Sequence, residues 1–507
     1  MNPESERSTS FWSADFGLPH RPSLMLDAAA DVVVVGAGIA GLSAAYELSC
    51  AGLHVVVLDR GPMGGGMTSR TTAHLASDWD DYYYHLISLR DVEEARLIYE
   101  SQAAAIDRIE HISEAEQIAC DFVRLDGFLV EAPEHAGSDL LERELEACHE
   151  VGFTGVSLAP GGPLPGSRRS LSFPRQGRLH PRKYLNGLIG AVEGRGGQCF
   201  GNTPATHVEE SGNSVTVHLE NGRSLRAGAA LIATNAPITD KVAILAKQAP
   251  YRTYALAGEV PRNTVRDALI WDTEDPYHYV RLQPVDDDRA MLIVGGEDHK
   301  AGEARDMDDR LAALEGWARD NFPSMRDVQH RWSGQVYEPA DTVPFIGRDA
   351  GAERVFIATG DSGQGMTTGV VAGIILRDLV LKRSNPWAEV YDPRRISAKA
   401  LGEVARENVT TVRQMAKHLL PGELGSMDEL RPGQGAIVRA GLQKLAAYRA
   451  ASGRLYVHSA TCTHAGCVVE WNPFELCWDC PCHGSQFAPE GGVLNGPAVH
   501  PLKPAEG

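Results

Sequence analysis

The sequence predicts an α/β fold with a parallel sheet, followed by a separate small domain at the carboxyl end. Three observations lead to this prediction. Residues 31–59 read as strand, glycine turn, helix and strand, and residues 355–380 repeat the strand, glycine turn and helix. Five of the nine cysteines then crowd into residues 462–482. A chain of 507 residues has room for about three domains at roughly 150 residues each.

Composition and charge exclude several function classes. The formal net charge is -19, so the field of the protein repels nucleic-acid phosphates and anionic lipid. No apolar run approaches the ~18 residues of a membrane span, and residues 1–22 do not resemble a signal peptide. Cys50, Cys120, Cys148 and Cys199 are scattered singly, which is typical of a reducing compartment. We therefore expect a cytoplasmic protein with no nucleic-acid partner and no membrane span.

The first glycine turn has the spacing of a dinucleotide-binding unit. Gly36 allows the tight turn, Gly38 lets the backbone approach a pyrophosphate, and Gly41 lets the helix pack closely on the strand. The phosphates would meet the amino terminus of the helix, and Asp59 would accept the ribose hydroxyls. The alternative is a glycine-rich turn that binds no nucleotide. Because strand, helix and terminal acid all occur in the required order, nucleotide binding is favoured.

Several segments together resemble the D-amino-acid-oxidase-like flavoproteins, which include glycine oxidase and sarcosine and dimethylglycine dehydrogenases. They are the chain through Leu75, residues 230–237, residues 341–348 and the loop at Gly360, which lies against the flavin ring in that family. The resemblance implies FAD as the cofactor. The FAD contacts expected from the motif and the resemblance are Gly36, Gly38, Ile39, Ala40, Gly41, Asp59, Arg60, Ser69, Arg70, Thr71, His74, Val208, Thr234, Gly347, Gly360, Gly363, Gln364, Gly365, Met366 and Thr367.

The same resemblance suggests residues on the substrate side. His74 falls where dimethylglycine and sarcosine dehydrogenases carry a histidine covalently joined to the flavin, whereas many relatives hold FAD noncovalently, so both attachments stay open. His180 matches a loop that enters the site just before a helix. His278, Tyr279 and Arg281 are further candidates, and the fork of Arg281 suits a substrate carboxylate. Alternatively, these alternating strand residues are simply packed or solvated.

The cysteine-rich segment has the order expected of a Rieske cluster. Its two loops read CTHAGC and CPCHGS, so each offers one cysteine and one histidine. In a Rieske centre two thiolates bind one iron and two imidazoles bind the other. A Cys2His2 zinc finger would instead present paired cysteines followed by paired histidines. The sequence therefore favours a 2Fe-2S Rieske cluster over zinc, with the ligands Cys462, His464, Cys480 and His483.

The carboxyl-terminal segment resembles the Rieske proteins of respiratory and photosynthetic cytochrome complexes. That resemblance implies a disulfide between Cys467 and Cys482, the alternative being two free thiols. Ser485 is kept as the donor to a bridging sulfide, whereas Phe487 replaces a tyrosine that donates to a ligand sulfur. With fewer donors, we expect a potential below the top of the range of about -150 to +300 mV.

Together the resemblances imply an α/β Rossmann-type FAD-binding domain with an inserted α+β substrate domain, followed by a small all-β Rieske domain. The predicted domains are a lead-in at 1–30, the FAD-binding domain at 31–76, 184–212 and 334–383, the substrate domain at 77–183 and 213–333, a helical connector at 384–425 and the Rieske domain at 426–507. Because the connector reads as structured, the Rieske domain should be docked on the rest of the chain.

The two cofactors predict a dehydrogenase. A flavin accepts two electrons and a Rieske cluster one at a time, so their combination suits oxidation of a substrate followed by single-electron exit to an external one-electron carrier or quinone-linked acceptor. The resemblance makes the carbon–nitrogen bond of an amine, amino acid or N-methylated amino acid the expected target. Three alternatives stay open: a reductive or biosynthetic enzyme charged by a ferredoxin-like donor, an oxygen-using amine oxidase, and a redox module without a substrate.

Overall fold

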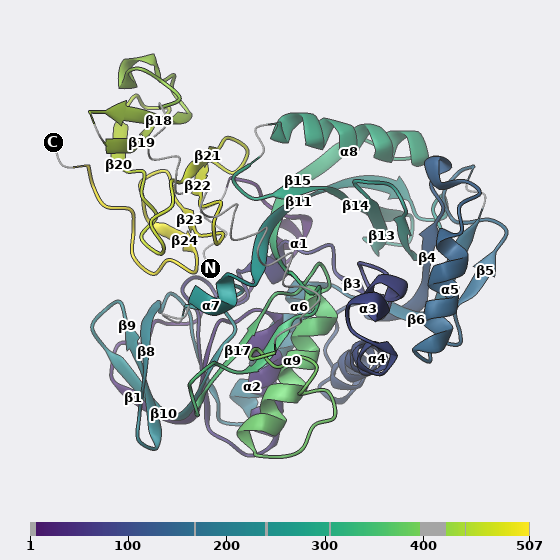
Figure 1. Ribbon diagram of the computed structural model, residues 1–507, viewed down its shortest axis with the longest axis horizontal. Helices are drawn as coiled ribbons and strands as arrows, with labels where there is room; N and C mark the ends of the chain where they lie inside the picture. Colours follow the sequence, from purple (N-terminus) through teal and green to yellow (C-terminus); the bar gives the residue numbers. More distant parts are fainter. Residues whose placement is uncertain are drawn as a thin grey trace.

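The computed structural model describes residues 7–166, 169–238, 242–303, 306–395, 422–441 and 443–505. Within these ranges the chain forms two large sheets and two small ones (Figure 1). The helices are α1 (Phe11–Asp15), α2 (Ile39–Cys50), α3 (Tyr83–Leu89), α4 (Val92–Ala115), α5 (Leu140–Glu150), α6 (Pro181–Gly194), α7 (Val242–Leu245), α8 (Met307–Asn321) and α9 (Gly365–Val380). No helix in the described ranges is both long and apolar enough to cross a bilayer.

The first large sheet is the parallel sheet that the sequence predicts. Four consecutive valines, Val32 to Val35, are buried in its strand β1, because both faces of a parallel sheet are covered. Strands β1, β2, β7, β10 and β17 run parallel. The strand order is β16 (Phe345–Arg348), β17 (Val355–Thr359), β10 (Ser224–Ile232), β1 (Ala28–Val35), β2 (Val55–Leu58) and β7 (Gln198–Phe200), with β9 (Ser214–Leu219) and β8 (Ala205–Ser211) branching from β10.

Helices α2 and α9 lie against each other because glycines remove the side chains between them. A Cβ atom on Gly369 would lie 2.6 Å from Cγ2 of Ile39, and one on Gly373 would lie 2.8 Å from the carbonyl carbon of Ser43. These distances leave no room for a side chain. The two glycine turns that precede the helices are therefore brought to the same edge of the sheet.

The second large sheet is mostly antiparallel and carries the predicted substrate domain. Helix α8 covers one face, where Leu311 and Leu314 join the core of the sheet. The strand order is β15 (Val328–Pro339), β11 (Gln248–Pro261), β14 (Arg289–Lys300), β13 (His278–Pro284), β12 (Leu269–Asp272), β4 (Val123–Val130), β6 (Ser170–Arg178) and β3 (His74–Leu75), with β5 (Ser157–Ala159) on β6.

Two predicted domain boundaries are wrong. Strands β9 and β10 were expected in the substrate domain at 213–333, but β10 pairs with β1 from Ala28 to Val35, so both strands belong to the FAD-binding sheet. Residues 334–339 were expected in the FAD-binding domain, but they lie in β15, which pairs with β11. Strand partners decide these boundaries, and partners distant in sequence leave no local pattern.

The carboxyl-terminal domain is all-β, as predicted. One small sheet contains β18 (Gln434–Ala440), β19 (Gln443–Arg449) and β20 (Leu455–Ser459). The other contains β21 (Glu470–Asn472), β22 (Cys477–Asp479), β23 (Gln486–Phe487) and β24 (Val493–Asn495). Of the predicted helical connector at 384–425, residues 384–395 form turns, and residues 396–421 lie outside the described residues. Figure 1 shows this domain, in olive green to yellow, beside β11 and β15 of the second large sheet.

Candidate active site and cluster site

A cavity of about 820 Å³ opens between the two large sheets. Both glycine turns contribute to its wall, as do strands of the antiparallel sheet. Sixteen of the expected FAD contacts line it. They are Gly36, Gly38, Ile39, Ala40, Asp59, Arg60, Arg70, Thr71, His74, Thr234, Gly360, Gly363, Gln364, Gly365, Met366 and Thr367.

The first glycine turn has the shape of a dinucleotide cradle. Gly36 has a φ of +106°, and a Cβ atom there would lie 2.2 Å from the carbonyl oxygen of Ala233. A Cβ atom on Gly41 would lie 1.8 Å from the carbonyl oxygen of Gly36, which is the close packing predicted for it. Asp59 is buried at the end of β2, and its Oδ2 accepts from the Ala37 amide at 2.8 Å. The carboxylate is thus fixed where ribose hydroxyls would meet it.

Four expected FAD contacts do not line the cavity. Gly41 packs behind the turn, and Ser69 is fully buried. Val208 packs on the apolar core of the parallel sheet, while Ala205 of the same strand lines the cavity. Gly347 lies in β16, outside the lining. For Val208 and Gly347 the resemblance indicated a strand, but which residues of a strand face the cavity depends on its pairing register.

His180 is a helix cap rather than a residue of the cavity. It is fully buried, and its Nδ1 accepts from the Lys183 amide at 3.3 Å, capping α6. Its Nε2 lies 3.2 Å from Oδ2 of Asp15. Burial lowers the pKa of His180 to about 4. The prediction that His180 faces the substrate is therefore wrong, and the signal was the following Pro181, which favours the first position of a helix.

Arg281 does not serve as a carboxylate clamp. Its guanidinium is buried and donates to the carbonyl oxygens of Ala73 at 2.7 Å and Leu179 at 3.0 Å. It also donates to Oε1 of Gln283 at 2.6 Å and lies 5.2 Å from the centre of the Trp12 ring. The predicted role in substrate binding is wrong, because protein groups occupy the fork. Arg281 instead holds the segment that carries His74.

Of the remaining substrate candidates, one lines the cavity. Tyr279 does so, and its hydroxyl forms a hydrogen bond with Thr253. His278 is not among the lining residues. Its ring stacks on Trp317 at 4.2 Å between centroids, and its Nδ1 lies 3.0 Å from Oδ2 of Asp272. The prediction for His278 is therefore wrong, since the two faces of strand β13 point to different surroundings.

His74 lines the cavity as a neutral imidazole. Its Nε2 donates to the carbonyl oxygen of Val280 at 3.2 Å, which leaves Nδ1 to accept from the Thr72 hydroxyl at 3.1 Å. Burial, followed by the charge of Arg281, lowers the pKa of His74 to about 3. The edge of its ring meets Tyr279 at 5.8 Å.

Sequence reasoning missed a group of carboxylates on the substrate side of the cavity. Burial raises the pKa of Asp78 to about 7, and it raises the pKa of Asp298 and of Asp361 to about 6. The run Asp78-Trp-Asp-Asp81, directly after a predicted FAD contact, was the available signal. The lining carboxylates outside the dinucleotide cradle are Asp78, Asp80, Asp81, Glu144, Asp272, Glu274, Asp275, Asp298, Glu338 and Asp361.

The four predicted cluster ligands lie together in the carboxyl-terminal domain. Cys462 and Cys480 are buried in one core cluster. The rings of His464 and His483 are perpendicular, with centroids 5.0 Å apart. Both Nδ1 atoms are buried without a hydrogen-bond partner, although buried polar atoms normally have one. Burial lowers the pKa of His483 to about 4, so the imidazole is in its ligand form. Two thiols and two unpartnered imidazole nitrogens fit a Rieske cluster.

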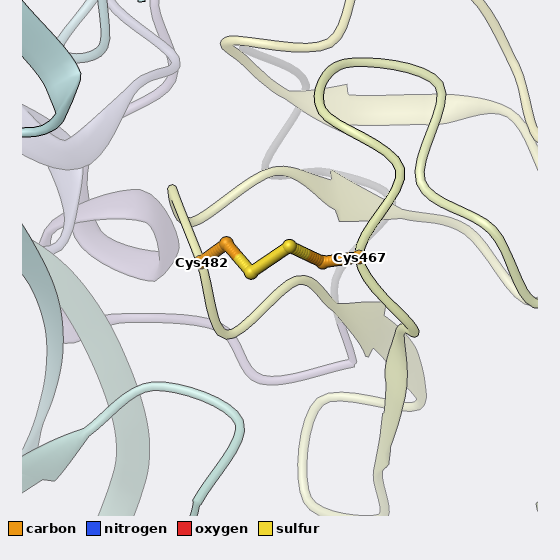
Figure 2. Close-up of a disulfide and its surroundings, with 2 residues drawn as sticks. All are labelled: Cys467 and Cys482. Carbon is orange, nitrogen blue, oxygen red and sulfur yellow. A yellow bond between two sulfur atoms is a disulfide. The ribbon is translucent and has the colours of Figure 1, made fainter. Parts of the chain in front are cut away.

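The predicted disulfide is confirmed. Cys467 and Cys482 are bonded across a Cα–Cα distance of 6.5 Å and tie the two ligand loops together (Figure 2). Ser485 is fully buried, and its Oγ accepts from the Ala498 amide at 3.0 Å. Phe487 is fully buried in the same core. The ligand loops are thus held by a covalent bond as well as by packing.

Two buried ion pairs dock the cluster domain on the rest of the chain. Arg70, which lines the cavity, donates to Glu475 at 2.6 Å, and the side chains are 3% and 0% exposed. Arg252 of β11 donates to both oxygens of Asp479 at 3.0 Å. Charges are rarely buried unless they are paired. The predicted docking is therefore confirmed.

Strand β15 connects the cavity to a cluster ligand. The hydroxyl of Tyr337 donates to the carbonyl oxygen of His483 at 2.9 Å, and Nε2 of Gln335 donates to that of Gly484 at 2.8 Å. Asn495 and Gly496 of the cluster domain line the cavity itself. The cavity wall is therefore completed by the carboxyl-terminal domain.

A substitution at Gly484 tests this interface. A Cβ atom on Gly484 would lie 2.4 Å from the Tyr337 hydroxyl, and its φ is +74°. We expect Gly484→Ala to lower the free energy of unfolding by about 1–3 kcal/mol through overpacking, beyond the cost of the backbone angle. Gly453→Ala is the control, because Gly453 has a φ of +87° and open space around it. Equal destabilisation of the two variants in denaturant unfolding would contradict the interface.

Comparison with known families assigns both parts of the chain. Residues 31–379 match the family described as DAO, FAD dependent oxidoreductase. The chain belongs to this family. Residues 422–506 match the Rieske 2Fe-2S domain, so this FAD dependent oxidoreductase carries a second cofactor domain. The family binds FAD, and the Rieske domain binds a 2Fe-2S cluster.

Relatives of this FAD dependent oxidoreductase share one or both parts. A protein of Bacillus subtilis (strain 168) named as the Rieske 2Fe-2S iron-sulfur protein YhfW is 31% identical over 98% of this chain and 97% of its own. Gamma-glutamylputrescine oxidoreductase of Escherichia coli (strain K12) is 26% identical over 69% of this chain and 83% of its own. Glycine oxidase from Geobacillus kaustophilus has a similar fold, with a TM-score of 0.61 and 17% identity over 73% of this chain and all of its own.

Proposed function

We propose that this FAD dependent oxidoreductase is a dehydrogenase acting on a carbon–nitrogen bond of an amine, amino acid or N-methylated amino acid. Its electrons leave through the Rieske domain to an external one-electron carrier or quinone-linked acceptor. The observation that carries the proposal is the shared wall, in which Asn495 and Gly496 of the cluster domain line the flavin cavity. FAD supplies two-electron acceptance from the substrate, and the cluster supplies one-electron transfer.

Tyr337 supports the proposed electron route. Its hydroxyl donates to the carbonyl oxygen of the cluster ligand His483. Its own carbonyl oxygen accepts from the Ser362 amide at 3.0 Å, in the turn between Gly360 and α9. A single side chain and its backbone thus join the second glycine turn to a cluster ligand. The short chain of covalent and hydrogen bonds favours transfer within the polypeptide.

The relatives support the carbon–nitrogen target. Glycine oxidase and gamma-glutamylputrescine oxidoreductase are named for nitrogen-bearing compounds. Their similarity covers the flavin part of this chain, where the substrate would bind. The unbonded thiols of Cys50, Cys120, Cys148 and Cys199 support the further proposal of a cytoplasmic location.

Anaerobic mixing tests the function. The purified protein is mixed with amines, amino acids and N-methylated amino acids, and flavin absorbance and electron paramagnetic resonance of the cluster are recorded. We expect a true substrate to bleach the flavin and to produce the reduced-cluster signal without added reductant. A bleached flavin beside a cluster that stays oxidised would contradict the route. Rapid reoxidation of the flavin by oxygen, with peroxide formed at the full rate, would favour an oxidase.

We expect the flavin to be noncovalently held. Both ring nitrogens of His74 already form hydrogen bonds, with Thr72 and Val280. Acid precipitation should therefore release the yellow colour into the supernatant, and His74→Ala should bind FAD that is released in the same way. Colour that stays with the precipitated protein and disappears in His74→Ala would establish a covalent bond.

A further inference from the structure

We propose that the substrate side of the cavity binds an organic cation with more than one ammonium group and no carboxylate beside the reacting nitrogen, such as a diamine or polyamine. The inference rests on the proposed function, because it names the substrate class of the same cavity. Of the amine, amino acid and N-methylated amino acid classes in that proposal, it keeps only the amines.

The charges of the cavity wall favour a cation. Ten carboxylates line the cavity outside the dinucleotide cradle. The lining arginines in the described part of the chain are Arg60, next to Asp59 of the cradle, and Arg70, which pairs with Glu475, and no described lysine lines the cavity. The guanidinium of Arg281 donates to protein oxygens elsewhere. A substrate carboxylate would therefore meet acidic side chains and no cation to hold it.

Two carboxylates have an oxygen that is placed to accept a hydrogen bond from a ligand. Asp78 lines the cavity, is 8% exposed, and has an Oδ1 atom without a hydrogen-bond partner. Oδ1 of Asp298 also has no hydrogen-bond partner. A buried carboxylate oxygen without a donor is costly, and an alkylammonium group supplies N–H donors together with a compensating charge.

Asp80 is placed to hold the nitrogen nearest the second glycine turn. A Cβ atom on Gly363 would lie 2.4 Å from Oδ2 of Asp80, so the carboxylate lies directly against that turn. The same oxygen accepts from the Tyr277 hydroxyl at 3.2 Å. Asp80 thus lies between the glycine turn and an aromatic residue of the substrate domain.

Aromatic rings line the cavity between the carboxylates. Tyr82 and Tyr84 stack at 5.4 Å between centroids, and Tyr277 and Tyr279 pack at 5.5 Å. Aromatic faces attract alkylammonium cations and also cover methylene groups.

The cavity wall also has more carboxylates than one ammonium group can contact. They come from the segment before α3, from α5, from the end of β12 and the turn after it, from β14 and β15, and from the turn before α9. An ammonium group has three donors at most. Carboxylates that come from several elements of the cavity wall, together with aromatic rings, therefore match ammonium groups separated by methylenes.

Binding and reduction by matched compounds test the substrate class. Full-length holoprotein is titrated anaerobically with putrescine, spermidine, butylamine, glycine and sarcosine, and flavin absorbance is followed. Putrescine or spermidine should act at concentrations at least about 10-fold below those of butylamine and of both amino acids, because a second buried charge pair is made. The diamine 2,5-dimethylhexane-2,5-diamine keeps its N–H donors but has no hydrogen on the carbons that bear nitrogen, so it cannot be oxidised; it should bind in calorimetry and perturb the flavin spectrum.

Single substitutions distinguish the carboxylates of the cavity from a carboxylate elsewhere on the surface. Asp80→Asn and Asp78→Asn should each weaken binding of 2,5-dimethylhexane-2,5-diamine at least about 10-fold. Glu93→Gln, at a side chain that is 67% exposed, is the matched control and should leave binding unchanged. The substrate class is overturned if 2,5-dimethylhexane-2,5-diamine fails to bind, or if glycine or sarcosine reduces the flavin at lower concentration than the diamines.

Photoreduction distinguishes a wrong substrate class from a wrong electron route. Light-driven reduction of the flavin needs no substrate, so reduced-cluster signals in that experiment support the electron route whichever compound binds. Preference for an amino acid together with cluster reduction would overturn the substrate class alone. An oxidised cluster beside a photoreduced flavin would overturn the route, whatever the titrations give.

Discussion

Replacing Arg70 with methionine is expected to lower the free energy of unfolding by about 3–5 kcal/mol, because it leaves the carboxylate of Glu475 buried and uncompensated. Both side chains of this pair are almost fully buried. Arg70 also donates to the carbonyl oxygens of Ser8 at 3.1 Å and Ser333 at 2.5 Å, so three segments of the chain lose a common donor. Denaturant unfolding followed by flavin fluorescence measures the change.

Two further variants make the Arg70 prediction specific. Arg96→Met removes an exposed pair with Glu93, whose side chains are 41% and 67% exposed, and should cost no more than about 1 kcal/mol. Adding Glu475→Leu to Arg70→Met should recover part of the loss, since an apolar replacement of both partners of a buried pair is often tolerated. If Arg70→Met unfolds like the Arg96→Met control, the docked interface is wrong.

Replacing His464 with alanine is expected to abolish the cluster while the flavin stays reducible. His464 supplies one of the two unpartnered imidazole nitrogens, so its loss would leave one iron with only one of its two imidazole ligands. Turnover with a one-electron acceptor should fall by more than the ~100-fold that loss of an outer-shell partner can cost. Iron and sulfide analysis, electron paramagnetic resonance and anaerobic flavin bleaching are the measurements.

The control for His464→Ala is His500→Ala. His500 is exposed, and only its backbone carbonyl accepts from Thr463 of the ligand loop, so removal of its side chain should leave iron and sulfide content unchanged. The FAD content of both variants should equal that of the parent protein. Zinc in place of iron and sulfide in the parent protein would contradict the cluster assignment, and unaltered turnover of His464→Ala would contradict the electron route.

Local motifs carried the predictions that the structure and the family comparisons bear out. The turn at Gly36 and the carboxylate of Asp59 are separated by one strand–helix–strand unit, so their spacing alone brings them together at one cavity. The two ligand loops of the Rieske domain are equally compact in sequence, and the disulfide between Cys467 and Cys482 followed from the resemblance. In both cases the chemistry depends on residues that are close along the chain.

The substrate side could not be predicted in this way. His180 and Arg281 are residue types that suit catalysis, yet the first caps a helix and the second donates to protein oxygens. Asp298, which does line the cavity, comes from β14 and carries no recognisable motif. Which side chains reach a cavity depends on strand register and on the packing of distant elements.

The sequence by itself determined that this protein has two redox cofactors, because a glycine turn and a pair of cysteine–histidine loops are local devices with fixed spacing. The tertiary structure alone decided which carboxylates line the cavity and that Asn495 of the cluster domain completes its wall. The physical reason is that a cavity wall and a domain interface are built from contacts between residues far apart in sequence, and no local pattern encodes those contacts.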